Sequence, residues 1–133
     1  MKNMRGCYVL IIKVEKRMLA EVGKLGVLQF EKGFYAYVGS ALNRLEMRIS
    51  RHLSAEKKFH WHIDYFLDKA KIKEIWYKEG GEECKVASVF SSCASIKGFG
   101  CSDCACGSHL FYSPSYKKLV YFLKKSEMEK YKT

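Results

Sequence analysis

Residues 7–14 read Cys-Tyr-Val-Leu-Ile-Ile-Lys-Val, a short apolar run rich in β-branched residues. Such a run is typical of a buried strand. Two further extended segments, 27–31 and 34–38, lie on either side of Lys32-Gly33, and we expect them to form a hairpin. The chain therefore begins with three strands that follow one another closely, which favours a sheet of the meander type.

Helical periodicity dominates the rest of the chain. We expect helices over 41–54, 60–70, 82–92 and 116–131, the first with Ser40 as its N-cap, a strand over 72–78, a loop over 94–108 and a short strand over 109–112. This order indicates the α+β class: a small mixed or antiparallel sheet, made of the three N-terminal strands and a later strand, flanked by helices. The 133 residues predict a single domain, 1–133, with a Cys-rich loop at 94–109 and a basic C-terminal helix at 116–131.

The charge of the chain is strongly positive. Lys and Arg number 24 against 14 Asp and Glu, which gives a formal net charge of +10. A basic domain of this size attracts polyanions, of which nucleic acid is the commonest, although a basic surface can also serve solubility alone. The sequence contains no run of 18 apolar residues and no signal peptide, so we expect no membrane partner and a cytoplasmic location.

The cysteines are a second compositional feature. Without a secretory signal we expect free thiols or metal ligands. Cys101, Cys104, Cys106 and His109 supply four soft ligands within nine residues and are candidate ligands of a Zn²⁺ ion. The alternative is a loop of small buried thiols, because zinc sites usually combine two separated pairs of ligands. Cys7, on the first strand, is expected in the core.

Four residues from three predicted elements are the candidate catalytic groups. Tyr8 and Tyr37 lie on neighbouring strands, where their phenols can share one shallow surface. Gly39 lets the backbone turn sharply into the next helix. Arg48 and His52 stand at i and i+4 on that helix, so both side chains can reach the same spot. Taken singly, each has a plainer explanation, because aromatics favour strands and an arginine favours a solvated helix face.

Together these residues resemble the GIY-YIG nuclease superfamily. Residues 6–8, Gly-Cys-Tyr, are similar to its first half-motif. Residues 37–53, Tyr-Val-Gly-Ser-Ala-Leu-Asn-Arg-Leu-Glu-Met-Arg-Ile-Ser-Arg-His-Leu, resemble the second half-motif and the helix that carries the family's catalytic arginine. The whole chain, including His-Trp-His-Ile-Asp-Tyr at 60–65 and Phe-Gly-Cys-Ser-Asp-Cys at 99–104, looks like a small branch that stands alone or is joined to DNA-repair enzymes.

The resemblance implies a nuclease that cleaves phosphodiester bonds with one divalent metal, Mg²⁺ or Mn²⁺. It implies that Tyr8 helps to activate the attacking water, that Tyr37 supports this site by hydrogen bonding, and that Arg48 contacts the scissile phosphate. The chemistry agrees with these residue types. A guanidinium holds two phosphoryl oxygens, Mg²⁺ prefers carboxylate oxygen and water, and a phenol with a pKa of about 10 needs a nearby cation to act as a base at neutral pH.

The metal-binding glutamate is where the sequence departs from the family's pattern. The family places an acidic residue inside the helix that corresponds to 82–92, but the position near Ala87 is not acidic. Glu83 is the nearest candidate ligand for Mg²⁺ and Glu82 is the second. Both also suit the N-terminal end of a helix for electrostatic reasons alone. Asp103, in the Cys-rich loop, is a further candidate carboxylate.

Further basic and histidine side chains are candidate contacts to nucleic acid. They are Arg44, Arg51, His60, His62, Lys117 and Lys118. Basic side chains neutralise backbone phosphates without reading the base sequence, but a solvated helix face explains the two lysines equally well. On a strand, His60, His62 and Asp64 would share a face and resemble a metal site, whereas the predicted helix brings together only His60 and Asp64.

The sequence therefore predicts a metal-dependent endonuclease acting on DNA, and the resemblance adds DNA repair as the expected context. Two other classes of function stay open. One is a non-catalytic nucleic-acid-binding module on the same fold, which the missing acid near Ala87 favours, and the other is a small zinc-stabilised adaptor. The preferred substrate structure, the oligomeric state and any protein partner do not follow from the residues.

Overall fold

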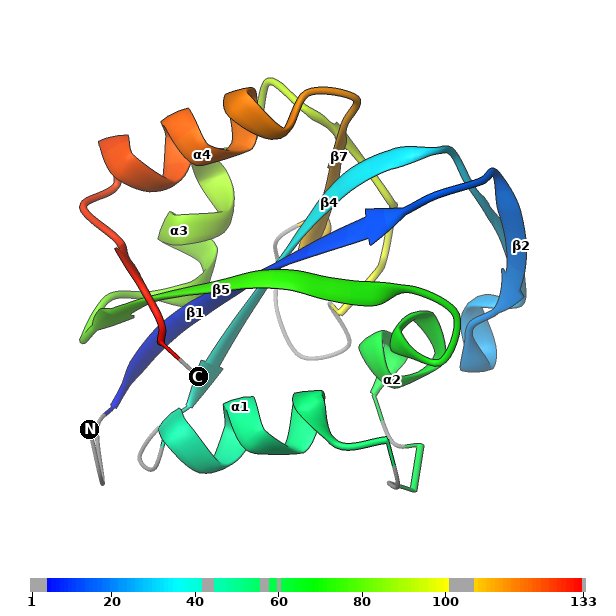
Figure 1. Ribbon diagram of the computed structural model, residues 1–133, viewed down its shortest axis with the longest axis horizontal. Helices are drawn as coiled ribbons and strands as arrows, with labels where there is room; N and C mark the ends of the chain where they lie inside the picture. The colour runs from blue at the N-terminus through cyan, green and yellow to red at the C-terminus, as the bar shows by residue number, and fades with distance from the viewer. Residues whose placement is uncertain (1–4, 42–44, 56–57, 60, 101–106, 133) are drawn as a thin grey trace.

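A six-stranded, mostly antiparallel sheet organises the molecule (Figure 1). The computed structural model describes residues 5–41, 45–55, 58–59, 61–100 and 107–132. The strands lie in the order β6-β7-β4-β1-β5-β8. Their bounds are β1 Gly6–Val14, β4 Gly33–Ala41, β5 Lys71–Glu79, β6 Ala94–Ser95, β7 Leu110–Ser113 and β8 Glu129–Lys130. Together with the helices, this sheet confirms the predicted α+β class.

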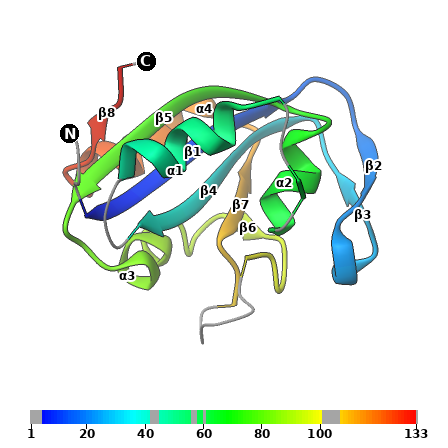
Figure 2. The same cartoon turned by 90° about the horizontal axis from the view of Figure 1, so that it is seen from below.

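Helices cover both faces of the sheet. Figures 1 and 2 show α1 (Leu45–Leu53) and α2 (His62–Leu67) on one face, and α3 (Glu83–Ser88) and α4 (Tyr116–Lys125) on the other. Ser115 caps α4, because its Oγ accepts a hydrogen bond from the backbone N–H of Lys118 at 3.3 Å. No helix in the described part of the chain is long and apolar enough to cross a membrane.

The central strand β1 is apolar on both of its faces, and Lys13 is its one exposed residue. It pairs with β4 on one side and with β5 on the other. Alternate residues of β1 therefore enter two different cores. Tyr8, Leu10 and Ile12 pack toward α1 and α2 with Leu45, Ile49, Ile63 and Phe66. Cys7, Val9 and Ile11 pack toward α3 and α4 with Val86, Leu119 and Leu123.

The predicted hairpin between 27–31 and 34–38 is wrong. In the structure, β3 (Val27–Phe30) pairs with β2 (Met18–Glu21) in a separate two-stranded sheet, while β4 pairs with β1 and β7. The 3-10 turn η1 (Gly23–Leu25) connects β2 to β3. Only one residue of β2 is buried, so the strand carries little hydrophobic signal in the sequence. Pairing of β4 with β1 over nine residues buries far more apolar surface than the expected hairpin would.

Several element boundaries also differ from the predictions. Ser40 is not a helix cap, because it lies within β4. The helices expected over 60–70 and 82–92 are shorter, as α2 and α3 show. The predicted loop begins with β6, and the C-terminal helix ends at Lys125 because Glu127 adopts a left-handed conformation with φ 60°. The chain then rejoins the sheet as β8.

A buried ion pair fixes α1 to α2. The guanidinium of Arg51 donates to both carboxylate oxygens of Asp64, at 2.8 and 2.9 Å. Asp64 is fully buried and also accepts a hydrogen bond from the backbone N–H of Trp61 at 2.9 Å. The Arg51 guanidinium lies 4.2 Å from the centroid of the Trp61 ring. Because this fork is bidentate and largely shielded from water, we expect it to contribute to stability more than an exposed ion pair does.

Replacing Asp64 with Ala should destabilise the protein by about 2–4 kcal/mol, because Arg51 and the start of α2 lose their shared acceptor. Urea unfolding of the two proteins measures this loss. Asp68→Ala is the matched control, since Asp68 is an exposed carboxylate one turn further along. An equal loss of stability in the two variants would contradict the role given to Asp64.

Candidate active site

Glycine at position 39 makes room for the phenol of Tyr8. The register of β1 and β4 places Tyr8 directly opposite Gly39. A Cβ atom at Gly39 would lie 2.4 Å from both Cζ and Oη of Tyr8, so any larger residue would collide with the ring. Gly6 is similarly confined, because its Cβ would lie 2.2 Å from the carbonyl oxygen of Lys78. The glycines of both half-motifs are therefore explained by close approach.

Tyr8 and Tyr37 lie on the same face of the sheet and both contact His52, so the predicted convergence of these side chains is confirmed. The Oη atom of Tyr8 is 2.6 Å from Nε2 of His52, and the two ring centroids are 5.4 Å apart. The Tyr37 ring lies edge-on to the same imidazole at 6.1 Å. His52 is 2% exposed, whereas its neighbour Leu53 is 47% exposed, so α1 turns the imidazole rather than the leucine inward. The hydrogen bond to Tyr8 accounts for this orientation of α1.

The expected shallow surface is instead a buried one. Tyr8 is 1% exposed and Tyr37 is 8% exposed. Burial raises the pKa of Tyr8 well above its ordinary value, and Tyr37 raises it further, while Arg48 opposes the shift only in part. At neutral pH the phenol is therefore protonated. When Nε2 of His52 carries no proton, the hydroxyl donates to it, and the imidazole is then the nearest acceptor for the phenolic proton.

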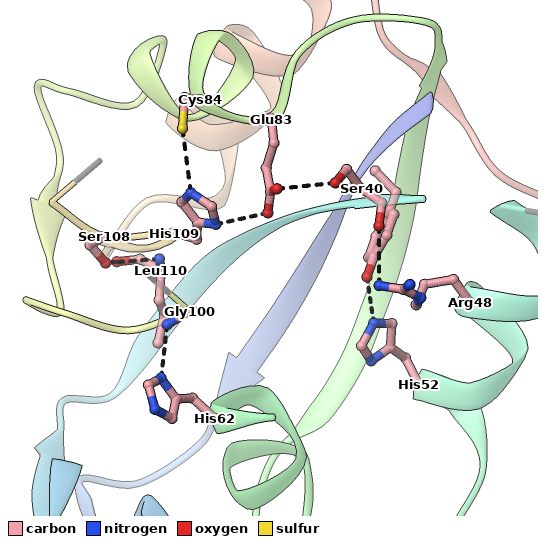
Figure 3. Close-up of polar contacts among 11 residues, drawn as sticks. Ser40, Arg48, His52, His62, Glu83, Cys84, Gly100, Ser108, His109 and Leu110 are labelled. Atoms are coloured by element: carbon pink, nitrogen blue, oxygen red, sulfur yellow. Dashed lines mark hydrogen bonds and ion pairs between the residues drawn. The ribbon is translucent and has the colours of Figure 1, made fainter. Parts of the chain in front are cut away.

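Ser40 connects the cationic and anionic groups of the site, as Figure 3 shows. A guanidinium N–H of Arg48 donates to the carbonyl oxygen of Ser40 at 3.2 Å. The hydroxyl of the same serine donates to Oε2 of Glu83 at 3.0 Å. Residues of α1, β4 and α3 are thereby joined through one residue that directly follows Tyr-Val-Gly. We name the set Tyr8, Ser40, Arg48, His52 and Glu83 the polar cluster.

Glu83 is held in the ionised state by its neighbours. Oε1 lies 2.9 Å from Nδ1 of His109, which is nearly completely buried. Burial raises the pKa of Glu83, but the hydrogen bond and charge of His109, the hydroxyl of Ser40 and the charge of Arg48 together lower it below its ordinary value. Nε2 of His109 in turn lies 3.9 Å from Sγ of Cys84.

The position of Ala87 explains why the acid stands one turn earlier. Ala87 is 3% exposed and packs in the core shared by α3 and α4, so a carboxylate there would be buried among apolar side chains. Glu83, in the first turn of α3, instead reaches β4. Glu82, the second candidate, is exposed and lies 3.7 Å from Lys85, away from the polar cluster.

The other candidate residues are distributed differently. Arg51 is engaged by Asp64, and His62 accepts a hydrogen bond at Nδ1 from the backbone N–H of Gly100 at 2.9 Å. Burial lowers the pKa of His62. Lys117 and Lys118 are exposed on α4, across the sheet from Tyr8. Arg44, His60, Cys101, Asp103, Cys104 and Cys106 lie outside the described residues.

The cysteines fit the sequence-based expectation only in part. Cys7 is buried in the core, as expected, and both Cys7 and Cys93 carry free thiols. Cys84 is disulfide-bonded, so the expectation of free thiols or metal ligands is wrong for this residue. Within the part of the chain that the structure describes, no three or more His, Cys, Asp and Glu side chains form a candidate set of metal ligands. The predicted zinc ligand His109 contacts Glu83, and because Cys101, Cys104 and Cys106 lie outside the described residues, the zinc site stays a prediction.

A single carboxylate nevertheless suits the Mg²⁺ that the resemblance implies. Mg²⁺ is commonly bound by one or two carboxylates and completes its shell with water. Glu83 is ionised and its side chain is 31% exposed. Its two oxygens accept from Ser40 and His109, and a carboxylate offers about four acceptor positions, so further ligation is compatible with these contacts.

Three residues of the site were missed by the sequence analysis in the roles that the structure gives them. The sequence predicts a helix cap at Ser40 and a zinc ligand at His109, and it predicts no role for Trp61. The Trp61 ring lies beneath both arginines of α1, with Arg48 4.6 Å from its centroid. The position of Ser40 immediately after the second half-motif is the signal that could have identified it.

Gly39→Ala should displace the Tyr8 ring and break its hydrogen bond to His52, because the new methyl group would overlap the phenol. We expect a loss of about 1–3 kcal/mol in the free energy of unfolding, typical of an overpacked core. Urea denaturation measures it, with Gly107→Ala as control, since a Cβ at Gly107 meets nothing within 4 Å. A fully stable Gly39→Ala variant would show that the close approach is unimportant.

Glu83→Gln should alter the dependence of stability on pH. A carboxyl whose folded-state pKa is lowered stabilises the protein above its unfolded pKa and loses this effect as pH falls through the folded value. The stability difference between wild type and variant should therefore be constant above about pH 5 and shrink toward pH 3. Chemical denaturation at several pH values tests this. Glu82→Gln is the control, because Glu82 is the exposed neighbour of Glu83. If both variants showed the same dependence of stability on pH, the effect could not be attributed to the Glu83 carboxylate.

Comparison with known families agrees with this arrangement. Searches among curated proteins and among solved structures give no match. A family model described as "Domain of unknown function DUF123" matches residues 7–131, which run from β1 to the residue after β8. The chain therefore belongs to the DUF123 family, a family of GIY-YIG-like domains.

Proposed function

We propose that the protein is a metal-dependent endonuclease that hydrolyses phosphodiester bonds of DNA. The observation that carries the proposal is the polar cluster itself. An arginine, a phenol hydrogen-bonded to an imidazole, and an ionised carboxylate meet at one end of β1 and β4, although they come from different elements. The membership in a GIY-YIG-like family supports the same chemistry.

Arg48 is suited to bind the scissile phosphate. Its guanidinium donates to a neutral carbonyl oxygen and stacks on Trp61, so its charge is not neutralised by an ion pair among the described residues. A phosphate oxygen is a stronger acceptor than the Ser40 carbonyl because the hydrogen bond is then assisted by charge on both partners. The same contact would stabilise the charge that builds on the phosphoryl oxygens during cleavage.

Tyr8 and His52 provide a route for the proton of the attacking water. Because the phenol is protonated at neutral pH, it can take up a proton only as it gives its own to Nε2 of His52. The water oxygen then bonds to phosphorus and the bond to the leaving oxygen breaks. Since Tyr8 is almost completely buried, this step requires the phenol to become accessible to water when the substrate binds.

Glu83 is the residue that would hold Mg²⁺ or Mn²⁺. A divalent cation bound there supplies charge stabilisation and a Lewis acid. It also removes an electrostatic conflict, because an ionised carboxylate beside Arg48 would otherwise repel a phosphate group.

A non-catalytic nucleic-acid-binding module is the second candidate function. The near-complete burial of Tyr8 favours it, because a phenol that water does not reach cannot assist hydrolysis. The two candidates differ in one observable. Both bind nucleic acid, but only the nuclease produces cleaved strands when Mg²⁺ or Mn²⁺ is added.

Arg48→Ala should reduce cleavage of nicked or branched DNA in Mg²⁺ or Mn²⁺ by about 10²–10³-fold, because one donor to the developing charge is lost. Gel analysis of labelled DNA under single-turnover conditions measures the rate. Lys24→Ala is the control, since it removes one exposed positive charge from η1. Thermal melting of both variants should stay close to wild type. Unchanged cleavage in Arg48→Ala would refute the role, and binding without cleavage by wild type in either metal would support the module.

A further inference from the structure

A basic pocket lies at the far end of β1 from Tyr8. It has a volume of about 650 Å³ and is formed by two segments, residues 13–18 and 69–73. The first segment leads from β1 into β2, and the second leads from α2 into β5. Lys13 alternates along β1 with Tyr8, Leu10 and Ile12, so its side chain lies on the α3 and α4 face of the sheet, opposite to Tyr8 of the polar cluster. We call this cavity the basic pocket.

The lining of the basic pocket is strongly cationic. Its charged side chains are Lys13, Lys16, Arg17, Lys69, Lys71 and Lys73, with Glu15 as the one carboxylate. All six cationic residues are exposed. No ion pair within the described part of the chain joins any of these six to a carboxylate. Six cations with one carboxylate leave an excess of positive charge in the pocket, and an anionic ligand would offset it.

The sheet register brings like charges face to face in this pocket. Lys13 of β1 stands directly opposite Lys71 of β5. Directly opposed like charges destabilise an antiparallel pair. The register also shifts between Ile11 and Ile12, which leaves Lys73 as an extra residue in β5, and its Nζ lies 5.0 Å from the centroid of the Tyr116 ring of α4. The fold thus accepts a local electrostatic cost where Lys13 and Lys71 oppose each other.

In a second basic pocket, by contrast, the lysines contact other groups of the protein. It has a volume of about 400 Å³ and is lined by residues of β5, α3 and α4, including Lys78, Lys85 and Lys125. Here Lys78 donates to the carbonyl oxygen of Ser126 at 3.2 Å, and Lys85 lies 3.7 Å from Glu82. Lys125 lies 5.9 Å from the centroid of the Tyr121 ring, so all three lysines have contacts within the protein, whereas among the six cations of the basic pocket only Lys73 has such a contact in the described part of the chain, with Tyr116.

We propose that the basic pocket binds the phosphate backbone of nucleic acid at a place separate from the polar cluster. This rests on the proposed function only in taking DNA as the ligand. Five residues separate Tyr8 from Lys13 along β1, about 17 Å at the rise of a strand. The basic pocket would therefore hold a phosphate backbone well apart from the polar cluster, without reading base sequence.

The test compares the salt dependence of DNA binding in two triple variants. The pocket variant is Lys13→Gln, Arg17→Gln, Lys71→Gln, and the control is Lys85→Gln, Lys124→Gln, Lys125→Gln, which removes the same charge from α3 and α4. Fluorescence anisotropy with a 20-base-pair duplex in EDTA measures affinity without cleavage. The pocket variant should lower the slope of log K against log salt by about 2–3 and weaken binding at least about tenfold at 0.1 M salt. The control should change the slope by much less.

Other outcomes overturn the proposal. An equal fall in slope for both triple variants would mean that net charge, not the pocket, controls binding. Poly-glutamate tests an acidic protein as the ligand. If it binds wild type as tightly as DNA does, and if the pocket variant loses the same affinity for it, the ligand is an acidic protein rather than DNA. Misfolding is excluded if the pocket variant melts at or above the wild-type temperature, as removal of the Lys13–Lys71 repulsion predicts.

The result is independent of the cleavage experiment. If wild type cleaves DNA but the pocket and control variants show the same slope of log K against log salt, the basic pocket proposal fails and the proposed endonuclease function stands. If wild type does not cleave DNA in either metal but the slopes differ as expected, the proposed endonuclease function fails and the basic pocket stands.

Discussion

The antiparallel register of β1 with β4 is the constraint on which the site depends. It runs without a break from the pair Gly6–Ala41 to the pair Val14–Gly33, and it sets Tyr8 opposite Gly39. A slip of one residue would turn Tyr8 toward α3 and α4 and would place a side chain where the phenol now lies. The contacts of His52 and Arg48 to these strands all presuppose that alignment.

The parts of the structure that were predictable follow from local patterns. The apolar run of β1 identifies a buried central strand, and the two-residue period places Tyr8 and Tyr37 on one face. The spacing of Arg48 and His52 on one helix likewise brings both to the polar cluster. These predictions succeed because strand and helix geometry alone determine which side chains can meet within one element.

The parts that were not predictable depend on contacts between distant segments. Ser40 joins Arg48 and Glu83 only because α3 returns to the end of β4, and His109 reaches Glu83 only because β7 pairs with β4. No spacing of residues in the sequence indicates that α3 or β7 lies beside β4. The pairing of β2 with β3 was also not predictable. Both strands are short and bury too few residues to show the alternation of apolar and polar residues that is typical of a strand.

Charge is distributed unevenly between the polar cluster and the basic pocket, and this has a physical consequence. At the polar cluster, the charge of Arg48 faces that of Glu83, and the other arginine of α1, Arg51, is neutralised by Asp64 outside the cluster. A site so nearly balanced attracts a polyanion only weakly. Under the proposed function, affinity for a nucleic-acid backbone would then have to come from elsewhere in the molecule. The six exposed cations of the basic pocket are the group proposed to supply it.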